Sequence, residues 1–157
     1  MRRVKTVGII LGVLVGVFLV MQIIPYGRTH TNPPTTREPA WDSPRTRELA
    51  VRACFDCHSN NTAWPWYANV APFSWAVQFD VEIARGIVNY SQMDSHFPTA
   101  VYSGQRTRDG NMPPSKYMLA HPGANLTDAE RKELADGLDR TLGNSDSRPS
   151  QPVVSQQ

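Results

Sequence analysis

An uninterrupted apolar run near the amino terminus constrains this chain more than any other feature. The run from Val7 to Ile24 spans 18 residues, and Gln22 is its only strongly polar member. As an α-helix it would extend about 27 Å, close to the hydrocarbon thickness of a bilayer. A helix that is apolar on every side is poorly suited to the surface of a small soluble domain. The sequence therefore predicts a membrane anchor within residues 1–24.

The flanking charges predict the orientation of this anchor. Arg2, Arg3 and Lys5 precede the run, and basic residues favour the cytoplasmic side of a membrane. We therefore expect a single-pass protein with everything after the anchor on the far side. A cleaved signal peptide is the alternative, but it would need small residues at its cleavage site, and the first alanine of the chain is Ala40.

Small residues recur on one side of the expected membrane helix. Gly8, Gly12 and Gly16 follow one another at four-residue spacing. This pattern allows two membrane helices to approach closely. Pairing of this helix with another one is therefore an expectation, although glycine is common in membrane helices of every kind.

Composition divides the remainder of the chain into three parts. Residues 25–39 are rich in Pro and Thr and predict a tether. Residues 144–157 are dominated by Ser, Gln and Pro and predict a disordered tail. The part between them, residues 40–143, has the size of one domain. From residue 25 onward 13 basic residues face 14 acidic ones, so nucleic acid is not an expected partner.

Helix-capping signals predict an all-α domain. Ser43 followed by Pro44 is an N-cap with proline at the first helical position. Thr127 and Glu130 form a capping box, and Gly143 provides a C-terminal stop. No stretch shows the sustained alternation of a strand. The expected helices cover residues 43–54, 74–90 and 127–143.

The only two cysteines of the chain lie in one short motif. Cys54, Cys57 and His58 form a C-x-x-C-H pattern, which is typical of covalent c-type haem attachment. Cysteines three residues apart on a helical turn face the same way, so both thiols can reach the two vinyl groups of the porphyrin. The adjacent His58 is then placed to bind the iron as proximal ligand. The motif predicts one covalent haem c.

Other uses of these residues are less well supported. A thioredoxin-like dithiol would be expected in a βαβ context, which the sequence lacks. A zinc site would need further ligands at short spacing, and no other cysteine exists. A disulfide between Cys54 and Cys57 would close too small a loop to stabilise much.

A second iron ligand must come from elsewhere in the chain. Met112 is favoured because Pro113 and Pro114 would hold its segment extended at little entropy cost. His121 lies beside Pro122 and is expected to have a structural role. An open site is also left as an alternative. The full set of candidates is Met93, Met112, Met118, His96 and His121.

Aromatic residues follow the motif closely. They could pack against the porphyrin and exclude water, or form an ordinary aromatic core. As a candidate haem pocket we take Trp64, Trp66, Tyr67 and Trp75.

Several blocks together resemble the bacterial haem-binding domain family, whose members carry one c-type haem. The matching blocks are Ala53–Asn60, Trp64–Tyr67, Ala71–Trp75, Met112–Pro113, Tyr117, His121–Pro122 and Leu126. The resemblance implies thioether attachment at Cys54 and Cys57, proximal ligation by His58 and a role for the Met-Pro segment opposite. Together with the predicted anchor, these features lead us to expect a small cytochrome c-like helical haem domain behind a single membrane helix. We expect that helix in a bacterial inner membrane, with the haem domain in the periplasm or extracytoplasmic space.

These observations favour a non-enzymatic electron carrier. His and Met together saturate iron and leave no place for substrate, so single-electron exchange with redox partner proteins near the membrane is expected. The alternative is a haem-based sensor or small peroxidase with an open or displaceable site, because the stretch from Gln92 to Gly110 departs from the family pattern. A haem-free thiol oxidoreductase is a third hypothesis.

Overall fold

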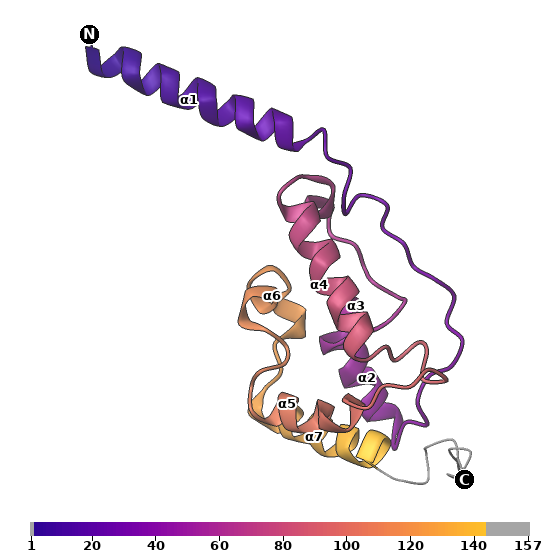
Figure 1. The fold of residues 1–157 in the computed structure, drawn as a ribbon. Coiled ribbons are helices and arrows are strands. Elements are labelled where there is room, and N and C mark those ends of the chain that lie inside the picture. The colour runs from indigo at the N-terminus through magenta and orange to yellow at the C-terminus, as the bar shows by residue number, and fades with distance from the viewer. Residues whose placement is uncertain (1, 144–157) are drawn as a thin grey trace, which may run out of the picture. The chain divides into compact units, whose positions relative to one another are not determined.

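The computed structural model describes residues 2–143, and these are helical with no β-strand. The all-α prediction is therefore confirmed, whereas the predicted tail at 144–157 lies outside the described residues. The α-helices are α1 (Arg2–Met21), α2 (Pro44–Ala53), α3 (Phe55–His58), α4 (Phe73–Ile87), α5 (Ser103–Arg108), α6 (Ser115–Ala120) and α7 (Asp128–Gly143) (Figure 1). Three 3₁₀ turns are η1 (Trp66–Asn69), η2 (Ala100–Tyr102) and η3 (Pro122–Ala124).

The chain divides into two compact units. Unit 1 comprises Met1–Thr31 and Ala63–Ile83, and unit 2 comprises Asn32–Thr62 and Ala84–Gln157. This division does not coincide with the predicted boundaries after residues 24 and 39. The reason is that the segment between those residues packs against parts of the chain that follow much later.

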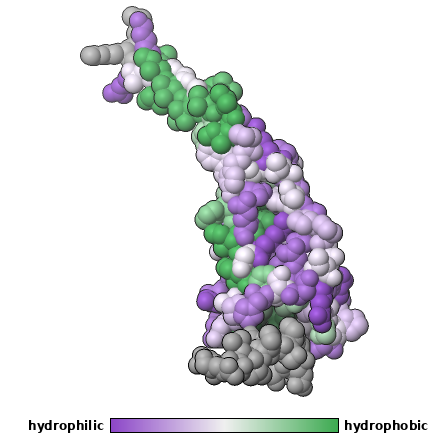
Figure 2. Space-filling model, turned by 45° about the vertical axis from the view of Figure 1, so that its right-hand side comes forward, coloured by the Kyte–Doolittle hydropathy of each residue, from purple (hydrophilic) through white to green (hydrophobic). Residues whose placement is uncertain are grey.

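Within unit 1, α1 carries the apolar run. Apolar side chains cover the helix beyond its charged first turns (Figure 2). In the described part of the chain, Arg3–Met21 is the one stretch of helix long and apolar enough to cross a membrane, and none of it is buried. The expected N-terminal apolar helix is thus present.

Gln22, the polar residue of the run, lies where α1 ends. Its Nε2 donates to the carbonyl of Phe18 at 3.1 Å and to that of Ala71 at 2.9 Å. Its Oε1 accepts from the Ala71 backbone N–H at 3.1 Å. The helix therefore stops at Met21, three residues before the apolar run does, because Gln22 turns to pair with another segment.

The segment predicted as a tether is hydrogen-bonded along its length. In unit 1, the Tyr26 hydroxyl donates to Glu82 at 2.8 Å. Gly27 follows with φ of +79°, and a Cβ there would collide with the Ser74 carbonyl, so only glycine suits this approach. In unit 2, the backbone N–H of Thr36 donates to the Ser91 carbonyl at 2.9 Å. These contacts hold residues that composition alone would leave free.

Unit 2 is built around one apolar core. Helix α7 packs against α2 and α5. The core gathers the buried residues Leu49, Ala50, Ala53, Phe55, Val88, Tyr90, Ala100, Leu126, Leu134, Leu138 and Leu142. The C-x-x-C-H motif begins at the end of α2, whose buried residues belong to this core. The core therefore holds the first residue of the motif in place.

The predicted caps are confirmed at both packed helices. At α2, the Ser43 hydroxyl accepts from the Thr46 N–H at 3.1 Å. Ahead of α7, Thr127 and Glu130 exchange the reciprocal bonds of a capping box at 2.9 and 3.2 Å. The helix predicted over residues 74–90 is α4, which ends earlier, at Ile87.

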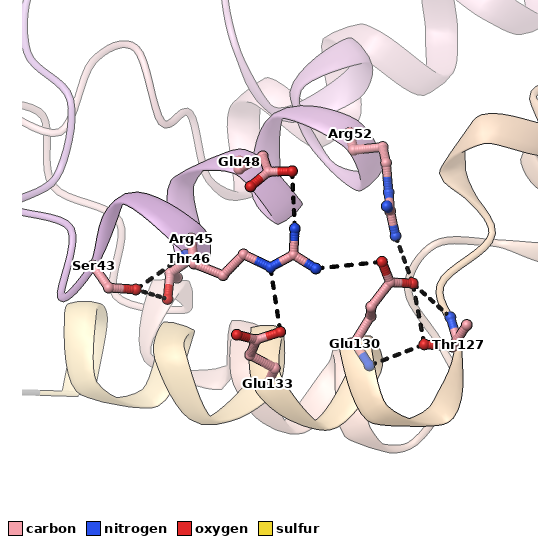
Figure 3. Close-up of polar contacts among 8 residues, drawn as sticks. All are labelled: Ser43, Arg45, Thr46, Glu48, Arg52, Thr127, Glu130 and Glu133. Carbon is pink, nitrogen blue, oxygen red and sulfur yellow. Dashed lines mark hydrogen bonds and ion pairs between the residues drawn. The ribbon is translucent and has the colours of Figure 1, made fainter.

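Ion pairs connect α2 to α7 across their solvent-facing side. Arg52 approaches Glu130 to 2.7 Å, and Arg45 lies 3.4 Å from both Glu130 and Glu133 (Figure 3). Exposed pairs of this kind contribute little singly. Together they bridge the two helices along this side.

Candidate functional site

The C-x-x-C-H motif forms a single helical turn. Cys54 caps the end of α2 and also precedes α3. Its carbonyl accepts from the backbone N–H groups of Cys57 and His58 at 3.2 and 2.9 Å. The three side chains are therefore presented by one turn of backbone, anchored at the end of a packed helix.

The two thiols are not joined by a disulfide. Cys54 packs against the core cluster, and this burial, with a smaller contribution from Cys57, raises the pKa of its thiol to about 12. A thiol that stays protonated at neutral pH is a poor redox nucleophile. This environment does not favour the hypothesis of a thiol oxidoreductase.

Two backbone carbonyls fix the ring of His58. Its Nδ1 lies 3.1 Å from the carbonyl oxygen of Ala84 and 3.1 Å from that of Val88. Since both partners can only accept, Nδ1 must carry the proton. The neutral ring then has its lone pair on Nε2, which is the arrangement that a metal-binding histidine needs.

Burial keeps this imidazole neutral. Desolvation lowers the pKa of His58, and the two carbonyl contacts oppose that shift without cancelling it. The two carbonyls belong to the last turn of α4 and to the residue after it. In this part of a helix the carbonyl groups are not all used by hydrogen bonds within the helix. His58 thus also caps α4, a structural role that is compatible with ligation through Nε2.

Behind His58 lies a buried polar network that sequence reasoning missed. The Asn89 amide donates to Asn60 Oδ1 at 2.8 Å, and Asn89 Oδ1 accepts from the Ser91 N–H at 2.9 Å. The Ser91 hydroxyl accepts from the Asn60 N–H at 3.0 Å, and the Tyr90 N–H donates to the His58 carbonyl at 2.8 Å. The available signal was the Asn-Tyr-Ser sequence directly after a helix.

A second contact joins the motif to α6. The Tyr117 hydroxyl donates to Oδ2 of Asp56 at 2.6 Å. Burial, and then the bond to this carboxylate, raise the pKa of Tyr117 well above its ordinary value. The ring of His121 stacks on Tyr117 at 4.2 Å between centroids, and its Nδ1 lies 3.1 Å from the Tyr117 carbonyl. These contacts fit the structural role expected for His121.

The other candidate iron ligands differ in their surroundings. Met112 is half-buried, and its backbone N–H donates to the carbonyl of Arg106. Pro114 has extended backbone angles, and the peptide bond between Met112 and Pro113 is cis. Met93 packs against the core cluster, which fits a core-filling role. His96 is exposed, and Met118 is half-buried in α6.

The aromatic residues proposed as a haem pocket belong to unit 1, whereas the motif belongs to unit 2. Trp64 stacks on His30 at 4.8 Å, and Tyr67 meets the edge of Trp66 at 5.9 Å. Trp75 comes from α4 and is half-buried. A pocket role for Trp64, Trp66, Tyr67 and Trp75 stays a prediction.

The donor set around the motif is suited to haem rather than to a bare ion. Within residues 2–143 the structure contains no group of three or more His, Cys, Asp and Glu side chains arranged to hold a metal. The motif offers one imidazole nitrogen with its lone pair available and two thiols on the same turn. These are the groups that attach and ligate a c-type haem.

Comparison with known proteins agrees with this donor set. A family model described as a haem-binding domain matches residues 16–140. That range contains the whole motif, the carbonyl partners of His58 and all the candidate second ligands. The searches of curated proteins and of solved structures found no match.

Proposed function

This chain belongs to the haem-binding domain family, and from that premise we propose that it is a membrane-anchored monohaem c-type cytochrome that transfers single electrons. Haem binding is the family's property. The covalent attachment, the electron transfer and the extracytoplasmic location are the proposal.

The observation that carries the proposal is the fixed tautomer of His58. Two carbonyl acceptors at 3.1 Å hold the proton on Nδ1 and leave Nε2 for iron. Such contacts orient the ring and raise its basicity as a ligand. His58 would therefore serve as proximal ligand without reorganising.

Cys54 and Cys57 would hold the porphyrin covalently. Each of the two thiols would be joined to one vinyl group of the porphyrin by an addition that consumes no oxidant. The turn that presents them is fixed by the N–H bonds to the Cys54 carbonyl. Protonated thiols suit this addition better than a disulfide would.

Met112 is the proposed second ligand. Haem iron, when bound, supplies a one-electron couple. A thioether carries no proton, so the Met112 side chain would bind with no acid–base step. A saturated metal offers no position for a substrate, which favours an electron carrier over an enzyme.

The location rests on α1 and its flanking charges. Arg3 and Lys5 lie in the first turns of α1, the one described helix that could cross a membrane. We propose that α1 spans the bacterial inner membrane with the haem domain in the periplasm or equivalent space. Redox proteins at that membrane are the proposed partners, and Gly8, Gly12 and Gly16 are the proposed face for helix pairing.

A redox titration of the purified full-length protein tests electron transfer. A reversible one-electron transition with a low-spin spectrum in both states is expected. The Met112→Ala variant should lose the weak red-edge band of methionine-ligated ferric haem and should bind carbon monoxide when reduced.

The same measurement separates the carrier from the sensor or peroxidase alternative. Rapid carbon monoxide binding by the reduced wild-type protein, unaltered in Met112→Ala, would contradict the carrier. Met118→Ala is the matched control, because Met118 is also half-buried and its removal should leave the spectrum as it is.

A further inference from the structure

An aromatic cluster in unit 1 is exposed. We call it the aromatic rim and define it as Trp66, Tyr67 and Phe73. The Tyr67 ring meets the other two edge-on, with centroids 5.9 Å from Trp66 and 6.2 Å from Phe73. Trp66 is 79% exposed and Phe73 is 59% exposed. The rim therefore presents contiguous apolar surface on unit 1.

The rim is held at the end of α1. Gln22 directly follows the last residue of that helix and exchanges two hydrogen bonds with the backbone of Ala71, at 2.9 and 3.1 Å. Ala71 is fully buried and lies two residues before Phe73 and five after Trp66. The amide of Gln22 thus ties the rim's own loop to the point where the apolar helix stops.

The length of α1 indicates how deep Gln22 would lie in a membrane that α1 spans. The candidate membrane span Arg3–Met21 has 19 residues, which extend about 28 Å as a helix. The hydrocarbon core of a bilayer is about 30 Å thick. If α1 spans it, Gln22 lies at the boundary with the headgroups. Ile23, which is 78% exposed, continues the apolar surface at this level.

We propose that the aromatic rim inserts into the phospholipid headgroup layer on the side of the membrane where the domain lies. Tryptophan and tyrosine are enriched at this depth because their rings combine an apolar body with a polar tip. The rim would act as a second membrane contact beside α1 and restrict rotation of unit 1. The inference rests on the proposed membrane anchoring by α1.

Photo-crosslinking of the full-length, haem-loaded protein in phosphatidylcholine vesicles tests this proposal. The vesicles contain a phosphatidylcholine with a photoactivatable group near its headgroup, and adducts are mapped by peptide mass spectrometry. Adducts are expected on the segment from Trp66 to Phe73 and on α1. The peptide that contains Leu119 is the control, because that side chain is 86% exposed but belongs to unit 2.

Thiol labelling gives an independent readout. A water-soluble, membrane-impermeant maleimide should react several-fold more slowly in vesicles with Trp66→Cys and Phe73→Cys than with Leu119→Cys. Equal rates at the three positions, together with lipid adducts on α1 only, would overturn the inference while leaving the anchor intact. Absence of adducts on α1 as well would overturn both. A shift of the haem absorption spectrum in Trp66→Cys would place this residue at the haem and overturn the inference.

Discussion

The Tyr117 hydroxyl donates a 2.6 Å hydrogen bond to Asp56, which lies between the two cysteines of the C-x-x-C-H motif. This bond connects α6 to the motif across 61 residues of sequence. It is partly buried and its acceptor is a carboxylate, so it belongs to the stronger class of protein hydrogen bonds.

Tyr117→Phe should lower the free energy of unfolding by about 1.5–3 kcal/mol, because it removes a hydrogen bond to a charged group. Urea denaturation followed by circular dichroism measures this. Tyr102→Phe is the matched control, since Tyr102 is 56% exposed and its change should have little effect. An unchanged unfolding midpoint in Tyr117→Phe would show that α6 is not held by this bond.

Asn89→Ala should be more damaging than most polar substitutions. It would leave Asn60 Oδ1 and the Ser91 N–H without their partner inside the domain, and each buried unpaired group costs about 1–3 kcal/mol. Urea unfolding of the haem-loaded protein checks the loss. The exposed Asn61 provides the control, and equal stability of Asn61→Ala and Asn89→Ala would contradict the network.

Gly137→Ala should destabilise the packing of α2 on α7. A Cβ at this position would overlap the Thr46 side chain, and overpacking of this kind costs about 1–3 kcal/mol. The matched control is Gly86→Ala in α4, where a Cβ would meet no atom within 4 Å. Because alanine is the better helix former by about 1 kcal/mol, that variant should raise the melting temperature. A rise in both variants would contradict the proposed close approach.

Glu130 should make the domain sensitive to acid. The Thr127 N–H, and then Arg52, lower the pKa of Glu130 to about 2. In an unfolded chain it would be about 4.3. The stabilisation that the ionised Glu130 contributes to the folded state is therefore complete above a pH of about 4.3. It is lost as the pH falls towards 2. The free energy of unfolding, measured across this interval, should vary less steeply in Glu130→Gln, and an identical slope would refute the assignment.

Helices whose ends are marked by local bonds could be predicted from the sequence. The start of α2 depends on Ser43 and Thr46, and that of α7 on Thr127 and Glu130. Each pair is three residues apart, so the capping interaction is visible in the pattern itself. The spacing of Cys54, Cys57 and His58 was predictable for the same reason.

Features that depend on distant partners were not predictable in this way. Composition indicated a free tether, but Thr36 bonds to Ser91 and Tyr26 to Glu82. The end of α1 at Met21 depends on Ala71, which lies 49 residues beyond Gln22. The carbonyl partners of His58 lie 26 and 30 residues away.

The short helices were missed for a different reason. Helices α5 and α6 have six residues each. Segments this short have no room for an apolar repeat, and they form only because the surrounding structure holds them.

The most direct test of covalent haem attachment is peptide mass spectrometry of the protein produced with a c-type haem maturation system. We expect the proteolytic fragment that contains Cys54, Cys57 and His58 to carry the added mass of one haem after acid and organic extraction. Replacement of both cysteines by alanine should abolish this addition. An unmodified fragment from a coloured wild-type protein would contradict the account.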